Sequence, residues 1–242
     1  MKKFLPIILF VIGLVVLVLV YFFVIKSPKK TNVVEDDTAL IEVSLNDRPI
    51  VSLTPTTDGH WLNLKIEKIK IPGAFSMDYE LLYDLPDGRT QGVPGSITLN
   101  GQTLIERELL LGSESSGKFR YDEGVKIGTM TIRFRNDKGK LIARFTTKFA
   151  LFSGVKVLES VDQAFIATLS KTTKGYFVVM ETFGIPKEVP SDVKSGPYGL
   201  FYSEKTTLSG EGKMGSYTTY IYKDSNWQKD LFDSGIFIGL GE

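Results

Sequence analysis

Hydrophobic and polar positions alternate along most of this chain. From Thr38 onward the dominant period is two, and a typical stretch places Leu62, Leu64 and Ile66 between polar neighbours. That period is typical of a strand with one buried and one solvated face. The stretches are short, Gly, Pro and Asn residues separate them, and no long amphipathic helix is evident before Leu151. The pattern predicts a mainly β protein containing an antiparallel β-sandwich region of the immunoglobulin-like type.

The first predicted β domain spans residues 38–153. Its clearest element is a hairpin from Thr129 to Leu151, in which apolar residues face one way and basic or polar residues face the other. This division indicates an antiparallel sheet with one wet side. Asn100-Gly101 is a strong hairpin signal and predicts another hairpin at that point. Apolar and polar residues also alternate over Ile41–Leu45, which predicts a strand there.

A second, smaller β domain is predicted for residues 154–242. Tyr176–Met180 is apolar at every position, which suits a strand buried on both faces. Further strands are expected at Ser216–Tyr222 and Gly235–Leu240. Gly184–Gly199 contains three prolines and predicts a long loop.

One uninterrupted apolar run, Phe4–Ile25, departs from the alternating pattern. At about 1.5 Å rise per residue, a helix of that length spans the roughly 30 Å hydrocarbon core of a bilayer. The run is longer than the apolar region of a signal peptide, and no small-residue cleavage pattern follows it. We therefore expect residues 1–25 to be a retained transmembrane anchor with the lipid bilayer as its partner, and the polar residues 26–37 to be a linker.

The orientation of the anchor is less clear from the sequence. Lys2 and Lys3 precede the apolar run, and Lys26, Lys29 and Lys30 follow it, so the positive-inside rule gives almost no bias. Long domains translocate largely regardless of charge. We therefore expect a single-pass protein of the cell membrane whose C-terminal region lies outside the cytoplasm.

Composition narrows the available chemistry. The chain has no cysteine, which excludes disulfides, thiolate nucleophiles and Cys-ligated zinc. It has one histidine, too few for a His-based metal site, and we predict no cofactor. Lys and Arg number 29 and Asp and Glu number 28, giving a net charge of +1. That balance gives no electrostatic footprint for nucleic acid.

Four features resemble parts of functional sites but have simpler explanations. Gly112–Lys118 fits the start of a P-loop, but Phe119 stands where a Ser or Thr would hold magnesium, and no helix is expected after it. His60 begins a strand, and without a Gly-x-Ser-x-Gly motif we expect it at the surface or in packing. Asp84–Gly88 and Asn136–Gly139 lack the ligand spacing of a calcium loop, and turn chemistry explains both. We therefore expect a protein that is not an enzyme.

Aromatic residues are dense near the C-terminus. A strand with aromatic side chains on both faces must be buried twice or present one face to a ligand, and exposed aromatic platforms bind sugars or proteins. The alternative is that these side chains fill a core between two domains. The candidate ligand-binding aromatics are Tyr220, Tyr222, Tyr202 and Trp227.

The sequence predicts a single-pass, membrane-anchored envelope protein whose exported β region has a binding or structural role. Its partner would be a protein or a glycan of the envelope. The alternative is an anchored hydrolase that acts on cell-wall glycans through a carboxylate pair, for which Glu106 and Glu108 are the formal candidates. An open cleft with two convergent carboxylates would distinguish the hydrolase from the binding protein.

Overall fold

The structure, a computed structural model, describes Leu14 and residues 40–189 and 191–241. Contacts divide the chain into two units, residues 1–36 and 37–242. The predicted anchor, Leu14 excepted, and the predicted linker at 26–37 lie outside the described residues. Within the described part of the chain, no helix is long and apolar enough to cross a membrane.

The second unit is mainly β, and its strands pair antiparallel, as the period-two pattern predicts. In chain order the strands are β1 (Ile50–Pro55), β2 (Trp61–Glu67), β3 (Ser76–Asp84), β4 (Thr90–Thr98), β5 (Ile105–Leu110), β6 (Gly112–Ser115), β7 (Lys118–Tyr121), β8 (Ile127–Arg135), β9 (Leu141–Ser153), β10 (Val157–Glu159), β11 (Ile166–Leu169), β12 (Tyr176–Glu181), β13 (Val193–Tyr202), β14 (Gly210–Lys213), β15 (Thr218–Lys223), β16 (Asn226–Lys229) and β17 (Gly235–Leu240).

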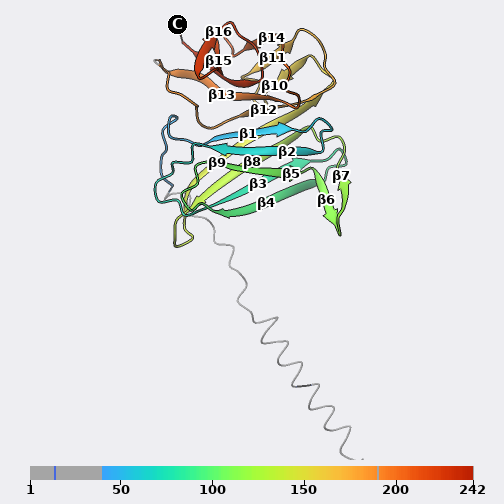
Figure 1. The fold of residues 1–242 in the computed structure, drawn as a ribbon, viewed down its shortest axis with the longest axis vertical. Helices are drawn as coiled ribbons and strands as arrows, with labels where there is room; N and C mark the ends of the chain where they lie inside the picture. The colour runs from blue at the N-terminus through green and yellow to red at the C-terminus, as the bar shows by residue number, and fades with distance from the viewer. Residues whose placement is uncertain (1–13, 15–39, 190, 242) are drawn as a thin grey trace, which may run out of the picture. The chain divides into compact units, whose positions relative to one another are not determined.

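These strands form one large sheet and three small ones (Figure 1). The large sheet has nine strands in the order β16-β15-β17-β13-β12-β9-β8-β3-β4. Two three-stranded sheets have the orders β1-β2-β5 and β10-β11-β14, and β6 pairs with β7 in a two-stranded ribbon.

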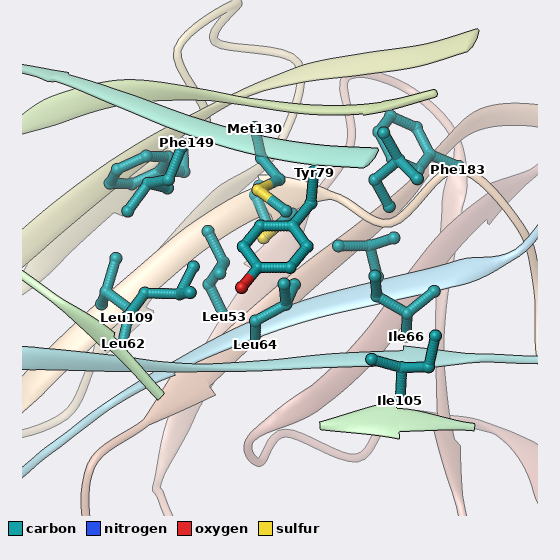
Figure 2. Close-up of a cluster of buried hydrophobic side chains, with 14 of the residues drawn as sticks. Leu53, Leu62, Leu64, Ile66, Tyr79, Ile105, Leu109, Met130, Phe149 and Phe183 are labelled. Carbon is teal, nitrogen blue, oxygen red and sulfur yellow. The ribbon is translucent and has the colours of Figure 1, made fainter. Parts of the chain in front are cut away.

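The sheet β1-β2-β5 packs against one face of the nine-stranded sheet and encloses the larger core. The alternating residues Leu62, Leu64 and Ile66 of β2 are buried, and Tyr79 of β3 and Met130 of β8 lie across from them (Figure 2). Full burial of an aliphatic or aromatic side chain stabilises the fold by about 1.5–3 kcal/mol. The period-two pattern therefore identifies the residues that hold these two layers together.

Strand β12 contributes to two cores at once. Val178 and Met180 belong to the larger core, whereas Phe177 and Val179 belong to a second core covered by β10-β11-β14. Successive side chains of a strand point to opposite faces. The two cores therefore lie on opposite faces of the nine-stranded sheet at β12, and the prediction of a strand buried on both faces is confirmed.

The hairpin predicted from Thr129 to Leu151 is confirmed as β8 and β9. The hairpin predicted at Asn100-Gly101 is wrong, although the turn itself forms, with φ angles of 46° and 77° at the two residues. Strand β4 pairs with β3, whereas β5 pairs with β2. The turn therefore takes the chain from one sheet to the sheet facing it, because turn chemistry sets the local backbone but does not select the next strand's partner.

The strand predicted at Ile41–Leu45 is absent, and the first strand of the described residues begins at Ile50. Ile41 is 40% exposed, and its backbone N–H donates to the carbonyl oxygen of Ile142 at 2.9 Å. The guanidinium Nε of Arg48 donates to the carbonyl oxygen of Val43 at 3.0 Å. Side-chain alternation is present here, but the N–H groups of Asp47 and Arg48 both donate to the Ser44 carbonyl oxygen, so the chain turns at residues 45–47.

The loop predicted over Gly184–Gly199 is shorter than expected, because β13 begins at Val193. Pro197 fits inside this strand because the pairing of β13 with β17 shifts register between Ser195 and Tyr198. A bulge is one of the few places in a sheet that accepts proline, since the proline nitrogen donates no hydrogen bond.

The predicted domain boundary at residues 153–154 coincides with the end of β9. Strands from both sides of that boundary share the nine-stranded sheet, since β9 pairs with β12. Residues 37–242 also group as one compact unit. Independent folding of 38–153 and 154–242 stays a prediction.

Candidate binding site

A groove of about 710 Å³ lies beside β10, where the small sheet β10-β11-β14 ends and the open face of β8 and β9 begins. Five parts of the chain line it: the turn 58–60, the segment 122–127, the end of β9, residues 155–163 around β10, and Tyr176. The groove therefore depends on the long-range pairing of the sheets.

The exposed apolar side chains of the groove, here called its floor, are aliphatic. Ile127 of β8 lies opposite Ala150 of β9, and the side chains of Val155 and Val157 complete the floor from the β10 side. Ile127, Val155 and Val157 are all exposed, and Val157 retains 45% of its accessible surface. Adjacent exposed aliphatic side chains rimmed by polar residues are a mark of a binding surface.

The rim of the groove is acidic. Asp58, Asp122, Glu123 and Glu159 line it, against the single lysine Lys126. A hydrogen bond from the Thr56 hydroxyl lowers the pKa of Asp58; partial burial opposes this effect, and contacts with His60 add to it. With four carboxyl side chains against one lysine, the groove has a negative formal charge, even though the whole chain carries +1.

Asp122 is fixed by a tyrosine from the larger core. The buried Tyr83 of β3 donates its hydroxyl proton to Oδ2 of Asp122 at 2.9 Å. Burial, followed by this hydrogen bond and the nearby carboxylate charge, raises the pKa of Tyr83 well above its usual range. The hydroxyl therefore stays protonated and holds one end of the 122–127 segment in place.

His60 lies at the acidic end of the groove, so the expectation of a surface or packing position fits its environment. Its Nδ1 is 3.3 Å from Oδ2 of Asp58, and its Nε2 is 3.7 Å from Oε1 of Glu123. Its ring stacks on Tyr121 of the β6–β7 ribbon, with the centroids 4.0 Å apart. Both imidazole nitrogens face carboxylates, an arrangement that joins the turn at 58–60 to the 122–127 segment and directs neither nitrogen at a serine or threonine hydroxyl.

The four aromatic residues predicted to bind a ligand do not line this groove. Tyr202 lies in the second core, 6% exposed and stacked on Phe177 with the centroids 4.4 Å apart. Its ring is therefore covered by protein. A ligand contact for Tyr202 conflicts with that burial, because the paired strand β12 supplies its stacking partner.

The other three aromatics lie together at the far end of the nine-stranded sheet. Tyr220 and Trp227 pack against a third cluster of buried side chains, which contains Ile185 and Ile238. The indole N–H of Trp227 donates to the carbonyl oxygen of Lys187 at 2.9 Å, and its ring meets Tyr222 edge-on at 5.2 Å. These contacts give the three residues a packing role, and ligand binding by them stays a prediction.

Glu106 and Glu108 share one face of β5, as expected. Both are exposed and lie opposite Lys65 and Asn63 of β2, beside a depression of about 420 Å³. They are next-but-one neighbours on a single strand and do not face each other across the groove beside β10. A substrate could therefore contact them from one side only.

A different acidic pair occupies a cavity of about 240 Å³ between β9, β12, β13 and the turn at 160–162. Burial raises the pKa of Glu181, with the Arg48 charge opposing this shift and the Asp162 charge adding to it. Burial also acts to raise the pKa of Asp162, but hydrogen bonds from Ser160, Tyr198 and the Ala164 N–H outweigh it, so the net shift is downward. Two nearby carboxylates with oppositely displaced pKa values resemble an acid and base pair.

Sequence reasoning missed both the groove and this pair. Asp58 and Glu123 come from separate connections, and Asp162 and Glu181 from a turn and a strand. Each pair meets only through sheet pairing, so no local spacing marks it. Within the described residues, no group of three or more His, Cys, Asp or Glu side chains could hold a metal ion.

No protein-family model matches the chain, and no curated protein or solved structure matches it either.

Proposed function

We propose that this chain is a single-pass, membrane-anchored envelope protein whose exported β region binds a partner in the groove beside β10. The observation that carries the proposal is the groove itself, with an exposed aliphatic floor and an acidic rim. Exposed apolar surface of this kind is costly in water and is retained where a partner covers it. The partner is a protein or a glycan of the envelope and not a nucleic acid, because the rim is negative.

The anchoring part of the proposal rests on the sequence. Phe4–Ile25 has the length and composition of a membrane-spanning helix. A folded β unit behind a short N-terminal tail favours placement outside the cytoplasm. Two antiparallel layers packed over alternating side chains support a β-sandwich, and we extend the proposal to the immunoglobulin-like class.

Binding is favoured over catalysis in the groove because His60 contacts Asp58, Glu123 and Tyr121, and no serine or threonine hydroxyl of the described residues is hydrogen-bonded to its ring. A histidine that activates a hydroxyl nucleophile lies within hydrogen-bond reach of that hydroxyl. The remaining polar groups of the groove, mostly carboxylates on its rim, suit recognition of charge.

The absence of cysteine allows a direct test with the full-length protein in its membrane. Val157→Cys places a thiol in the groove, and Leu104→Cys places a control thiol at an exposed site that does not line it. We expect a membrane-impermeant maleimide to label both variants in intact cells. We also expect Val157→Cys to react at least severalfold more slowly in cells than after purification, while Leu104→Cys reacts equally in both.

Two results would contradict this proposal. Labelling that requires cell lysis would place the β region on the cytoplasmic side. Equal reactivity of Val157→Cys in cells and after purification would show that nothing covers the groove in the membrane.

The hydrolase alternative has one observation in its favour, the carboxylate pair Asp162 and Glu181. In a retaining or inverting glycosidase, a protonated carboxyl serves as the acid and an ionised one as the nucleophile or base. This alternative expects release of reducing sugar from cell-wall glycan by the wild type and its loss in Glu181→Gln. Our main proposal expects no release from either protein, with Glu114→Gln on the exposed strand β6 as the matched control.

A further inference from the structure

We propose that the occupant of the groove is an extended polypeptide segment with Lys or Arg residues between apolar residues, which adds a strand to the free edge of β10. This inference rests on the proposed function of the groove and names the class of its partner. Three features carry it: the unpaired backbone of β10, the alternation of its side chains, and the charge of the rim.

The backbone of β10 is paired on one side only. The Leu169 N–H donates to the Lys156 carbonyl oxygen at 2.8 Å, and the Ser160 N–H donates to the Phe165 carbonyl oxygen at 2.9 Å. Together with the pairing of Leu158 and Ala167, these bonds direct the even-numbered residues toward β11. In an antiparallel pair, the intervening residues direct their N–H and C=O groups the other way.

The free backbone groups of β10 therefore belong to Val157 and Glu159. No other strand of the described residues pairs with this edge, because β10 is the outer strand of its sheet. The groove lies on this side of β10, since β11 and β14 on the other side contribute nothing to its lining. An incoming strand would find unpaired donors and acceptors at the point where it contacts the aliphatic floor.

The edge of β10 has neither the proline nor the bulge that protects some other sheet edges. Strand β4, at one end of the nine-stranded sheet, contains Pro94, which cannot donate to a neighbouring strand. Strand β10 reads Val157-Leu158-Glu159 and has no proline or bulge. Proteins usually protect an exposed edge unless that edge is used in pairing.

Side chains of β10 give the incoming strand its pattern of contacts. Leu158 is fully buried in the second core, whereas Val155, Val157 and Glu159 line the groove. A strand paired here would direct alternate side chains toward the aliphatic floor. The apolar residues of the partner would therefore occur at every second position.

The acidic rim of the groove favours Lys or Arg at the positions of the partner that lie between its apolar residues. Asp58, Asp122, Glu123 and Glu159 outnumber Lys126 at the rim. Complementary charge speeds association and disfavours partners of the wrong sign. A second copy of this chain would bring Glu159 of each copy to the same edge. Sugars stack on exposed aromatic faces, whereas the exposed apolar side chains of the groove are Ile127, Val155 and Val157, and its aromatic residues Phe152 and Tyr176 are partly buried.

The test uses full-length protein in detergent micelles and a synthetic probe, the capped peptide Lys-Val-Lys-Ile-Lys-Val. Two matched probes replace Lys by Glu or carry N-methyl groups at alternate backbone nitrogens. We expect binding of the first probe and at least roughly tenfold weaker binding of each of the others, since each matched probe removes either the charge or the strand pairing.

Variants of the protein locate the binding. Val157→Pro removes an edge donor without touching a bond to β11, and we expect it to weaken binding by roughly tenfold. Glu123→Lys should weaken binding severalfold, more at low salt, while Glu114→Lys on the exposed strand β6 is the matched control. Unchanged circular dichroism and melting midpoint establish that each variant is folded.

Equal binding of the methylated and unmethylated peptides, or equal binding to wild type and Val157→Pro, would overturn the inference. So would failure of the Lys-Val probe to bind. If that failure accompanies continued protection of Val157→Cys in cells, the groove has an occupant of another class, such as a glycan, and the proposed function stands. Loss of both signals would remove the proposed function as well.

Discussion

The ring of Tyr79 in β3 lies across Gly95, its cross-strand partner in β4. A β-carbon added at Gly95 would come within 2.2 Å of the Cζ atom of that ring. Tyr79 also lies at the centre of the larger core, between the two sheets (Figure 2). The Tyr79 ring can therefore pack in this position only because residue 95 is a glycine.

Substitution of this glycine should destabilise the fold. Gly95→Ala forces the Tyr79 ring off its position, and overpacking of this kind costs about 1–3 kcal/mol. Denaturant unfolding of the full-length protein in micelles measures the cost. Gly241→Ala is the control, because its β-carbon would meet only the Lys194 side chain at 3.6 Å. Equal midpoints for the two variants would show that the ring moves aside freely.

Truncation of Tyr220 tests whether the aromatic face of β15 is packing surface. Tyr220 is half-buried against the cluster of Ile185, Ile238 and Leu240. We expect Tyr220→Ala to lower the free energy of unfolding by about 2–3 kcal/mol, near the low end for large aromatic truncations. Phe75→Ala, at an exposed aromatic residue, should change it by less than about 0.5 kcal/mol. An unshifted Tyr220→Ala midpoint would instead make this face a recognition surface.

A buried carboxylate gives the protein a defined acid sensitivity. Asp233 is 4% exposed, and burial acts to raise its pKa, but hydrogen bonds from Lys223 and from the N–H groups of Leu208 and Ser234 lower it below 3.8. A pKa lowered by folding contributes stability that is present above the unfolded value and is lost as pH falls through the folded value.

The corresponding measurement compares wild type with Asp233→Asn. We expect the variant to be less stable at pH 7 and the difference to shrink as the pH falls below about 4, where the wild-type carboxylate is protonated. Melting curves at a series of pH values provide the test. A difference that stays constant down to pH 2 would mean that the charge of Asp233 contributes nothing.

For Glu181 we expect the opposite dependence of stability on pH. Burial raises its pKa above 4.5, against the opposing Arg48 charge and with the Asp162 charge, so its ionised form is disfavoured in the folded state. That cost sets in as pH rises through the unfolded value. Glu181→Gln should therefore melt at a higher temperature than wild type at pH 7, with the gain vanishing near pH 4. A lower midpoint at pH 7 would show that the carboxylate makes stabilising contacts that the amide cannot replace.

The sequence was informative wherever local pattern and tertiary environment coincide. Leu62, Leu64 and Ile66 alternate because β2 has one core face, and Phe177 and Val178 are both apolar because β12 has two. At such positions, the spacing of apolar residues along the sequence predicts which faces of the strand are buried. The turn at Asn100-Gly101 was recognised for the same reason, since its positive φ angles are a local requirement.

The groove could not be predicted, because its parts come together only when the sheets pair. Val157 looks like any strand residue until β10 is known to be an outer strand. Asp58 and Glu123 come from different connections, and His60, from the same turn as Asp58, contacts both of them. Ile41–Leu45 shows the opposite error: its side chains alternate, but the chain turns at residues 45–47 and no strand forms.

Because β12 packs in both cores, each half of the β unit depends on the other for the burial of its side chains. If a recombination event removed everything after residue 153, the larger core would lose Val178 and Met180, and β9 would lose its neighbour. The segment that follows would in turn lose the strand against which β12 pairs. Either half alone would therefore expose apolar side chains and unpaired strand backbone to solvent, a combination that promotes association with other chains.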